Sequence, residues 1–132
     1  MKTAGIVAIA VLIAGSGLAL HVARAQQPGL TRVELQRHDL SVPGHEVIQV
    51  RFELAPGVSF PKYAHPGEEI LYVLEGSIEY QVESKTPVTL RAGEGFFIPA
   101  GAFHTARNVG GGNAAELATY VVEKGKPLSV VK

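Results

Sequence analysis

The sequence predicts an all-β domain, folded as a sandwich or a barrel, and three observations support this fold class. Apolar and polar residues alternate with a period of two over residues 47–54, which is typical of a strand with one buried face. Glycine and proline turn signals separate several short apolar segments. No segment after residue 25 keeps a helical repeat of apolar residues for three turns. Short strands joined by tight turns bury their apolar faces by packing two sheets together or by closing one sheet.

The first predicted strands lie in the middle of the chain. Residues 47–54 form one strand, which ends at the Ala-Pro-Gly turn signal of residues 55–57. Residues 70–74 are an uninterrupted apolar run, which predicts a strand buried on both faces. The Glu-Gly pair at residues 75–76 then turns the chain. Residues 78–82 alternate again, so these two strands are predicted to form a hairpin.

Four more strands are predicted nearer the C-terminus, and glycine or proline turns separate them. They cover residues 88–90, 96–98, 103–106 and 117–122. The segment before the first regular strand, residues 29–44, is less clear. Within it, residues 31–36 either add a strand to the sheet or form an arm that is exchanged with another copy.

The N-terminal segment has the order of a secretory signal peptide. A positive charge at Lys2 precedes an apolar run over residues 4–20, and Ala23-Arg24-Ala25 supplies small residues at a cleavage site. We therefore predict cleavage after residue 25, an exported protein that is periplasmic or secreted, and no membrane contact after cleavage. The alternative is an uncleaved anchor, because the run approaches the ~18–20 residues needed to span a bilayer.

Charge and composition exclude several classes of function. Cleavage would remove two of the twelve basic residues, Lys2 and Arg24, so that ten remain against twelve acidic residues, a formal net charge of −2. No basic stripe is left, so no nucleic-acid partner is expected. The chain has no cysteine, which excludes disulfides, thiolate metal sites and cysteine nucleophiles. The expected partners are a small molecule and a second copy of the chain. We expect a homodimer because a domain this short has a thin core and its sheets have edge strands.

Two stretches carry a more specific pattern. The first contains Gly57, Tyr63, His65, Glu69 and Gly76, and the second contains Gly93, Pro99, Gly101, His104 and Asn108. In order and spacing they resemble the two sequence motifs of the cupin superfamily, in its small bacterial single-domain form. The resemblance implies a double-stranded β-helix, or jelly-roll barrel. The expected organisation is a signal peptide at residues 1–25, an N-terminal arm at 26–45 and a cupin domain at 46–132.

The same resemblance implies that His65, Glu69 and His104 converge inside the barrel as metal ligands. A carboxylate placed among apolar side chains must be paired or metal-bound. Two neutral imidazoles and one carboxylate suit a divalent metal ion and leave positions open for water or substrate. Fe(II), Mn(II), Zn(II) and Cu(II) are the candidate ions.

One position departs from the cupin pattern, since Tyr63 stands where metal-binding cupins usually have their first motif histidine. A neutral phenol is a poor ligand because it would have to ionise from a pKa of about 10. Tyr63 is therefore predicted to donate a hydrogen bond in the pocket or simply to pack there, and in an enzyme to donate a proton. Either three ligands hold the ion, or the metal site is lost and Tyr63, His65, Glu69 and His104 form a metal-free hydrogen-bonded network.

Cupin barrels serve many activities, so the resemblance leaves three hypotheses about function. The first is a metal-dependent oxygenase, isomerase or lyase that acts on a small molecule in the barrel. The second is a module that captures a small molecule or a metal without chemistry. The third is a structural or interaction protein whose pocket is a relic.

Overall fold

The computed structural model describes residues 27–132, and all regular structure in this range is β-strand. The predicted all-β fold class is confirmed. Residues 27–132 contain no helix that is long and apolar enough to cross a membrane. The predicted signal peptide, residues 1–25, lies outside the described residues.

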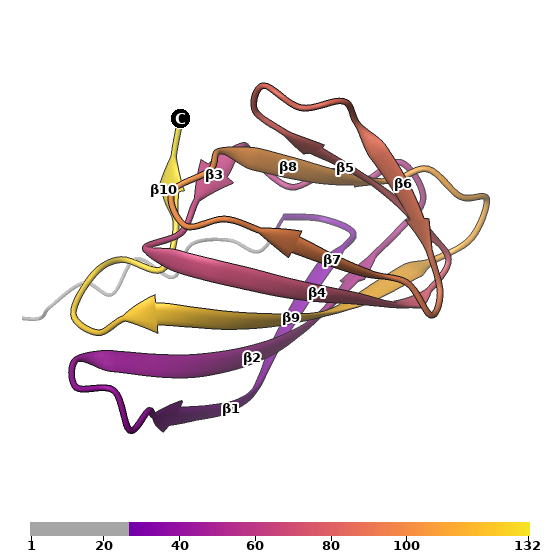
Figure 1. Cartoon of the computed structure of the whole chain (residues 1–132). Helices are drawn as coiled ribbons and strands as arrows, with labels where there is room; N and C mark the ends of the chain where they lie inside the picture. The colour runs from indigo at the N-terminus through magenta and orange to yellow at the C-terminus, as the bar shows by residue number, and fades with distance from the viewer. Residues whose placement is uncertain (1–26) are drawn as a thin grey trace, which may run out of the picture.

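Ten strands make up the described part of the chain. They are β1 (Leu30–Asp39), β2 (His45–Leu54), β3 (Tyr63–Ala64), β4 (Gly67–Glu75), β5 (Ser77–Val82), β6 (Val88–Arg91), β7 (Gly95–Ile98), β8 (His104–Asn108), β9 (Ala114–Glu123) and β10 (Val130–Val131). They form two five-stranded antiparallel sheets that face each other (Figure 1), in the orders β1-β2-β9-β4-β7 and β10-β3-β8-β5-β6. This arrangement is a jelly-roll barrel, as predicted.

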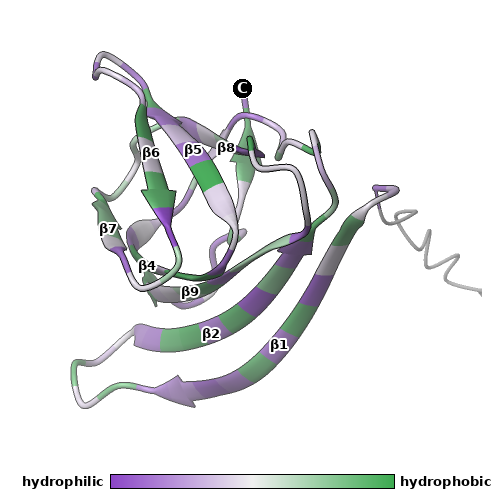
Figure 2. Ribbon diagram, turned by 90° about the vertical axis from the view of Figure 1, so that its right-hand side faces the viewer, coloured by the Kyte–Doolittle hydropathy of each residue, from purple (hydrophilic) through white to green (hydrophobic). Residues whose placement is uncertain are grey.

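The core lies between the two sheets and follows from the alternation of residues along each strand. In β2, Ile48, Val50, Phe52 and Leu54 are all buried, while the residues between them are more exposed. Figure 2 shows the resulting alternation of hydropathy along β1 and β2. The strand predicted at residues 47–54 is therefore confirmed, with the period of two that places one face against the core.

The hairpin predicted for residues 70–82 is wrong. The strands β4 and β5 follow one another in sequence, but β4 pairs with β9 and β7 whereas β5 pairs with β8 and β6. The chain crosses from one sheet to the other at Gly76, whose φ is 75°. A Cβ atom there would lie 2.7 Å from the carbonyl oxygen of Asn113, so a side chain has no room. Periodicity shows that two strands are adjacent in sequence, but it does not show which strands they pair with.

The prediction that β4 is buried on both faces is also wrong. Leu71 and Val73 point into the core, but Ile70 and Tyr72 are 49% and 46% exposed. Phe97 of β7, which lies opposite Ile70, is exposed as well. The apolar run at residues 70–74 therefore gives this sheet an apolar outer face, which no other element among residues 27–132 covers.

The N-terminal segment adds a strand to the sheet of its own chain. The strand β1 pairs with β2 from Leu30 opposite Leu54 to Asp39 opposite Glu46, with a bulge between Glu34 and Gln36. It forms the edge of the sheet and is exposed along almost its whole length. Residues 31–36 therefore lie in a strand that extends the sheet of the same chain.

Asn108 orders a loop. Its side-chain amide donates hydrogen bonds to the carbonyl oxygens of Leu54 at 2.9 Å and Gly112 at 2.8 Å. Its side-chain oxygen accepts one from the backbone amide of Gly110 at 2.9 Å. This buried side chain therefore ties the glycine-rich loop before β9 to the end of β2.

Candidate metal centre

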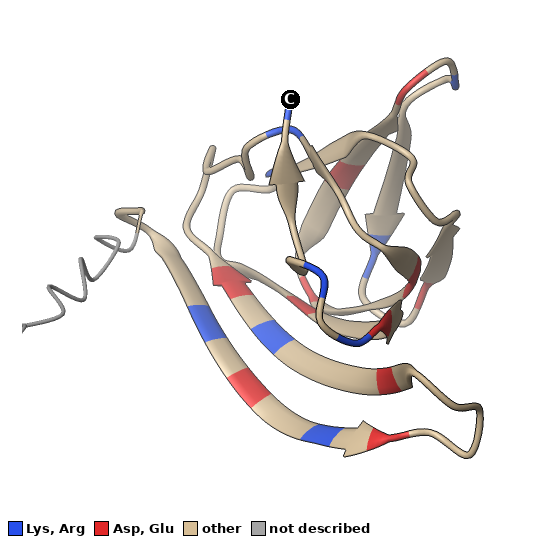
Figure 3. Ribbon diagram, turned by 90° about the vertical axis from the view of Figure 1, so that its left-hand side faces the viewer, with Lys and Arg blue, Asp and Glu red and all other residues tan. Residues whose placement is uncertain are grey.

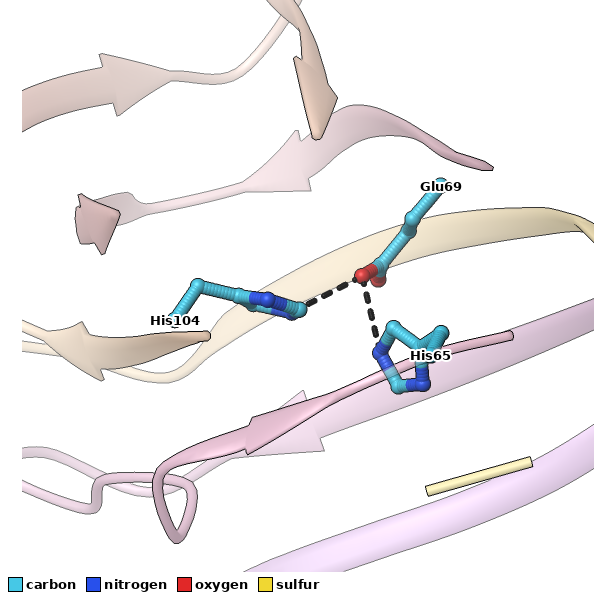
Figure 4. A group of neighbouring side chains, drawn as sticks. All are labelled: His65, Glu69 and His104. Carbon is cyan, nitrogen blue, oxygen red and sulfur yellow. Dashed lines mark ion pairs between the residues drawn. The ribbon is translucent and has the colours of Figure 1, made fainter. Parts of the chain in front are cut away.

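His65, Glu69 and His104 meet inside the barrel (Figure 4), and each is only 4% exposed. The Oε2 atom of Glu69 lies 3.1 Å from Nε2 of His65 and 3.0 Å from Nε2 of His104. Among residues 27–132, these three side chains form a group whose ligand atoms lie close enough together to hold one metal ion. The structure thus brings together the three residues that the sequence motifs suggested.

Two short strands that the sequence did not reveal help to position the histidines. The strand β3 pairs with β8 through Tyr63 opposite His104, and with β10 near the C-terminus. Directly after β3, His65 and the turn at Pro66 lead into β4, where Glu69 faces inward. A Cβ atom on Gly67 would lie 2.0 Å from the carbonyl oxygen of Val121, so glycine is required where β4 approaches β9.

Backbone carbonyls orient both imidazole rings. Nδ1 of His65 lies 2.7 Å from the carbonyl oxygen of Leu128, and Nδ1 of His104 lies 2.8 Å from that of Ala102. A carbonyl oxygen can only accept a hydrogen bond, so each Nδ1 carries a proton. In the neutral ring, Nε2 then presents its lone pair toward Glu69, and this is the tautomer that a metal ligand requires.

This arrangement leaves polar atoms without partners. Nε2 of His65 and Oε2 of Glu69 are buried, and neither has a hydrogen-bond partner among residues 27–132 despite their short separation. A lone pair on Nε2 facing a carboxylate oxygen is unfavourable unless a proton or a cation lies between them. The donor set and its unpartnered atoms therefore fit a divalent metal ion.

The electrostatics of the site favour the charged forms of Glu69 and His104. Burial disfavours the carboxylate, but the short contacts with His104 and His65 outweigh it and lower the pKa of Glu69. Burial likewise disfavours the imidazolium of His104. Its contacts with Glu69 and with the carbonyl of Ala102 outweigh that cost and raise the pKa of His104.

Two tyrosines cover the imidazole rings. The ring of Tyr63 lies 5.2 Å from that of His65 and 5.6 Å from that of His104, measured between centroids. Tyr120 of β9 lies opposite Glu69 in the β4–β9 ladder, with its ring 4.7 Å from that of His65. Burial, followed by the charge of Glu69, raises the pKa of both phenols, so both are neutral at physiological pH. Sequence reasoning missed Tyr120, because its place beside Glu69 depends on the register of two distant strands.

A cavity of about 340 Å³ adjoins this site. It is lined by Gln27, Leu30, Arg32, Phe52, Phe60, Pro61, Tyr63, Tyr120, Leu128 and Ser129. The three candidate ligands are absent from its lining, whereas both tyrosines form part of it. The phenols therefore stand between the cavity and the imidazoles.

A second buried acid faces the barrel interior. Glu116 of β9 is buried and accepts a hydrogen bond from the phenol of Tyr80 on β5. Burial, together with the charge of Glu69, raises the pKa of Glu116 to about 8. This carboxyl is therefore largely protonated at neutral pH. The sequence motifs do not include either residue.

Comparison with known proteins agrees with this architecture. Residues 50–125 match the cupin domain family. Germin-like protein 1-1 of Oryza sativa subsp. japonica is 36% identical over 88 residues, which cover 61% of this chain and 41% of that protein. The dimethylsulfoniopropionate lyase DddQ of Ruegeria pomeroyi is 37% identical over 51 residues, 39% of this chain and 25% of that protein. The chain thus spans less than half the length of these curated relatives.

The structural comparison points to the same kind of barrel. A solved structure of oxalate oxidase in complex with the substrate analogue glycolate superposes with a TM-score of 0.64 and is 27% identical. The superposition covers 80% of this chain and 57% of that one.

Proposed function

This chain belongs to the cupin domain family, and we propose that it holds a divalent metal ion with His65, Glu69 and His104 and acts on a small molecule. One observation carries the proposal. Two imidazoles, each oriented by a backbone carbonyl, direct Nε2 at the same carboxylate oxygen, 3.1 and 3.0 Å away. A set of two histidines and one carboxylate suits Fe(II), and Mn(II), Zn(II) or Cu(II) can use the same donors.

We propose an oxygenase, isomerase or lyase reaction. A bound ion would supply Lewis acidity and a fixed point for substrate oxygen atoms. Two relatives support this range of chemistry, because one is an oxidase solved with glycolate and another is a lyase. The chain covers only part of each, so their substrates are no guide to this protein's own substrate.

Within this proposal, Tyr63 is the proton donor. Its phenol is neutral because burial raises its pKa, and it lines the cavity that a substrate would enter. It also contacts both imidazole rings, so it lies between a molecule in the cavity and the two histidines. Tyr120 packs against the ring of His65 and lines the same cavity.

Elemental analysis of the purified chain, followed by thermal melts with each of the four ions, tests the metal proposal. A ligand that binds only the native state raises its stability by mass action. We expect at least one of the ions to raise the melting temperature, with chelator reversing the effect. A chain that carries no metal and that none of the four ions stabilises would refute the proposal.

A binding module with a metal-free pocket is the second candidate, and Tyr63 is the observation that favours it. A phenol replaces one expected ligand, and Glu69 already contacts both histidines directly. A tight small-molecule ligand that is not turned over, combined with no response to metal, would favour this function.

A further inference from the structure

Among residues 27–132, one cationic side chain lines the cavity beside Tyr63, and it comes from the N-terminal edge strand. Arg32 of β1 lies opposite Phe52 of β2 and lines the cavity together with Leu30. Every residue of β1 except Leu30 is exposed, Arg32 included, so the strand adds little to the core. The strand does, however, bring these two side chains to the cavity.

The rest of the wall is mainly apolar. Leu30, Phe52, Phe60, Pro61 and Leu128 line the cavity, and the rings of Phe52 and Phe60 meet edge to face with centroids 5.0 Å apart. Cavities of a few hundred Å³ with apolar walls and a few polar groups are typical of small-molecule sites. An apolar or aromatic group fits such a wall. The guanidinium of Arg32 favours a ligand in which that group carries an anionic substituent.

Arg32 has donors to spare for a ligand. Its only carboxylate contact among residues 27–132 is with Glu34, at 3.5 Å. Arg37 holds the same Glu34 more closely, at 3.0 and 3.3 Å, and also contacts Glu46 at 3.0 Å. Figure 3 shows these basic and acidic positions alternating along β1. A guanidinium has five N–H donors in a planar fork that matches a carboxylate, so one long contact leaves most of them free.

We propose that this cavity binds a small carboxylate with an apolar or aromatic body. The carboxylate pairs with Arg32, and the body packs against Phe52 and Phe60. The ligand then extends toward the phenols of Tyr63 and Tyr120. This inference names the substrate class of the proposed function and rests on it for any chemistry, but the anchor is Arg32 and binding does not require a metal ion.

Calorimetric titration of the purified chain with phenylacetate tests this inference. Two probes serve as comparisons: 2-phenylethanol keeps the aromatic body without the charge, and oxalate keeps the charge without the body. Phenylacetate should bind more tightly than either. Arg32→Met should weaken phenylacetate binding by at least about tenfold, because a charge-assisted bidentate pair is lost. It should leave the binding of 2-phenylethanol unchanged.

Arg51→Met is the matched control, because it removes the same charge from the neighbouring strand. Arg51 pairs with Glu53, and its side chain is 38% exposed against 42% for Arg32. We expect it to bind phenylacetate like the wild type. Equal losses in the two variants would overturn the inference, as would wild type that does not bind phenylacetate. Arg32→Lys keeps the charge but not the fork, so it should bind with intermediate affinity if Arg32→Met proves unstable.

Repeating the titration in chelator separates this inference from the metal proposal. Phenylacetate binding that persists in chelator, in a chain that no metal stabilises, would support the Arg32 anchor and refute the metal site. Metal stabilisation without phenylacetate binding would support the metal site and refute the Arg32 anchor.

Discussion

Tyr63 and His104 lie directly opposite each other in the β3–β8 pair, with ring centroids 5.6 Å apart and ring planes at 84°. The phenol thus occupies the space beside a candidate ligand, at a backbone position from which a side chain also reaches His65. No hydrogen bond involves the Tyr63 hydroxyl among residues 27–132, so the four-residue network considered from the sequence is reduced to Glu69 and the two histidines. Tyr63 contributes a ring to this site and also lines the adjoining cavity.

Tyr63→His should raise metal affinity. An imidazole at this position can supply a fourth ligand, and we expect at least about a tenfold gain. The measurement is the shift of melting temperature across a titration of Zn(II) and Mn(II). Tyr63→Phe, which keeps the ring and removes the hydroxyl, is the control and should behave like the wild type. If both variants respond alike, the position does not face the metal.

Glu69→Gln should abolish stabilisation by metal. An amide is a much weaker ligand than a carboxylate for these ions, and removing one of three ligands leaves too few to hold an ion. At a metal concentration one hundred times the dissociation constant, wild type should gain about 2.7 kcal/mol of unfolding free energy. The variant should gain almost none. Glu68→Gln, at the adjacent exposed position, should retain the full gain.

The sequence predicted the strands better than their partners. Alternation correctly located β2, and the paired motifs correctly brought His65, Glu69 and His104 into one barrel. The same reasoning joined β4 and β5 into a hairpin, because periodicity contains no information about which edge of a strand finds a partner. Side chains that reach the site only because two distant strands pair were missed for the same reason. Tyr120 is beside Glu69 only because β9 pairs with β4.

The outer face of the β4 sheet leads us to expect a homodimer. Ile70, Tyr72 and Phe97 are exposed on one surface, and cross-strand pairing places Ile70 against Phe97. Exposed apolar patches of this kind on small proteins commonly mark interfaces. Analytical ultracentrifugation should therefore give a dimer, and Tyr72→Glu should shift it to monomer. Arg51→Glu, on the same face over β2, is the control. A wild type that sediments as a monomer at micromolar concentrations would contradict this expectation.

The N-terminal sequence leads us to expect that the exported form begins at Gln26. The test is the intact mass of protein recovered from the exported fraction. A mass that lacks residues 1–25 would agree with cleavage after Ala25. A mass that retains them would identify a membrane-tethered protein.

Glu116 should make stability fall as the pH rises. Its pKa is raised by burial from the ordinary 4.5 to about 8 in the folded state. Below pH 4.5 the carboxyl is protonated in both states, so its contribution to stability is fully present. Between pH 4.5 and about 8 the unfolded chain has lost this proton and the folded chain retains it, so the free energy of unfolding decreases with pH. The maximum slope for one group is about 1.4 kcal/mol per pH unit.

Glu116→Gln isolates this contribution, because the amide stays neutral at every pH and its oxygen can still accept the hydrogen bond from Tyr80. Urea unfolding of both proteins in chelator, at intervals between pH 4.5 and 8, measures the difference. Wild type should lose stability relative to the variant across this window, since every other titrating group is shared. Parallel curves would mean that Glu116 ionises inside the barrel as easily as in water. Tyr80 would then donate its hydrogen bond to an ionised Glu116 carboxylate. Another interaction would have to offset the free-energy cost of burying that charge.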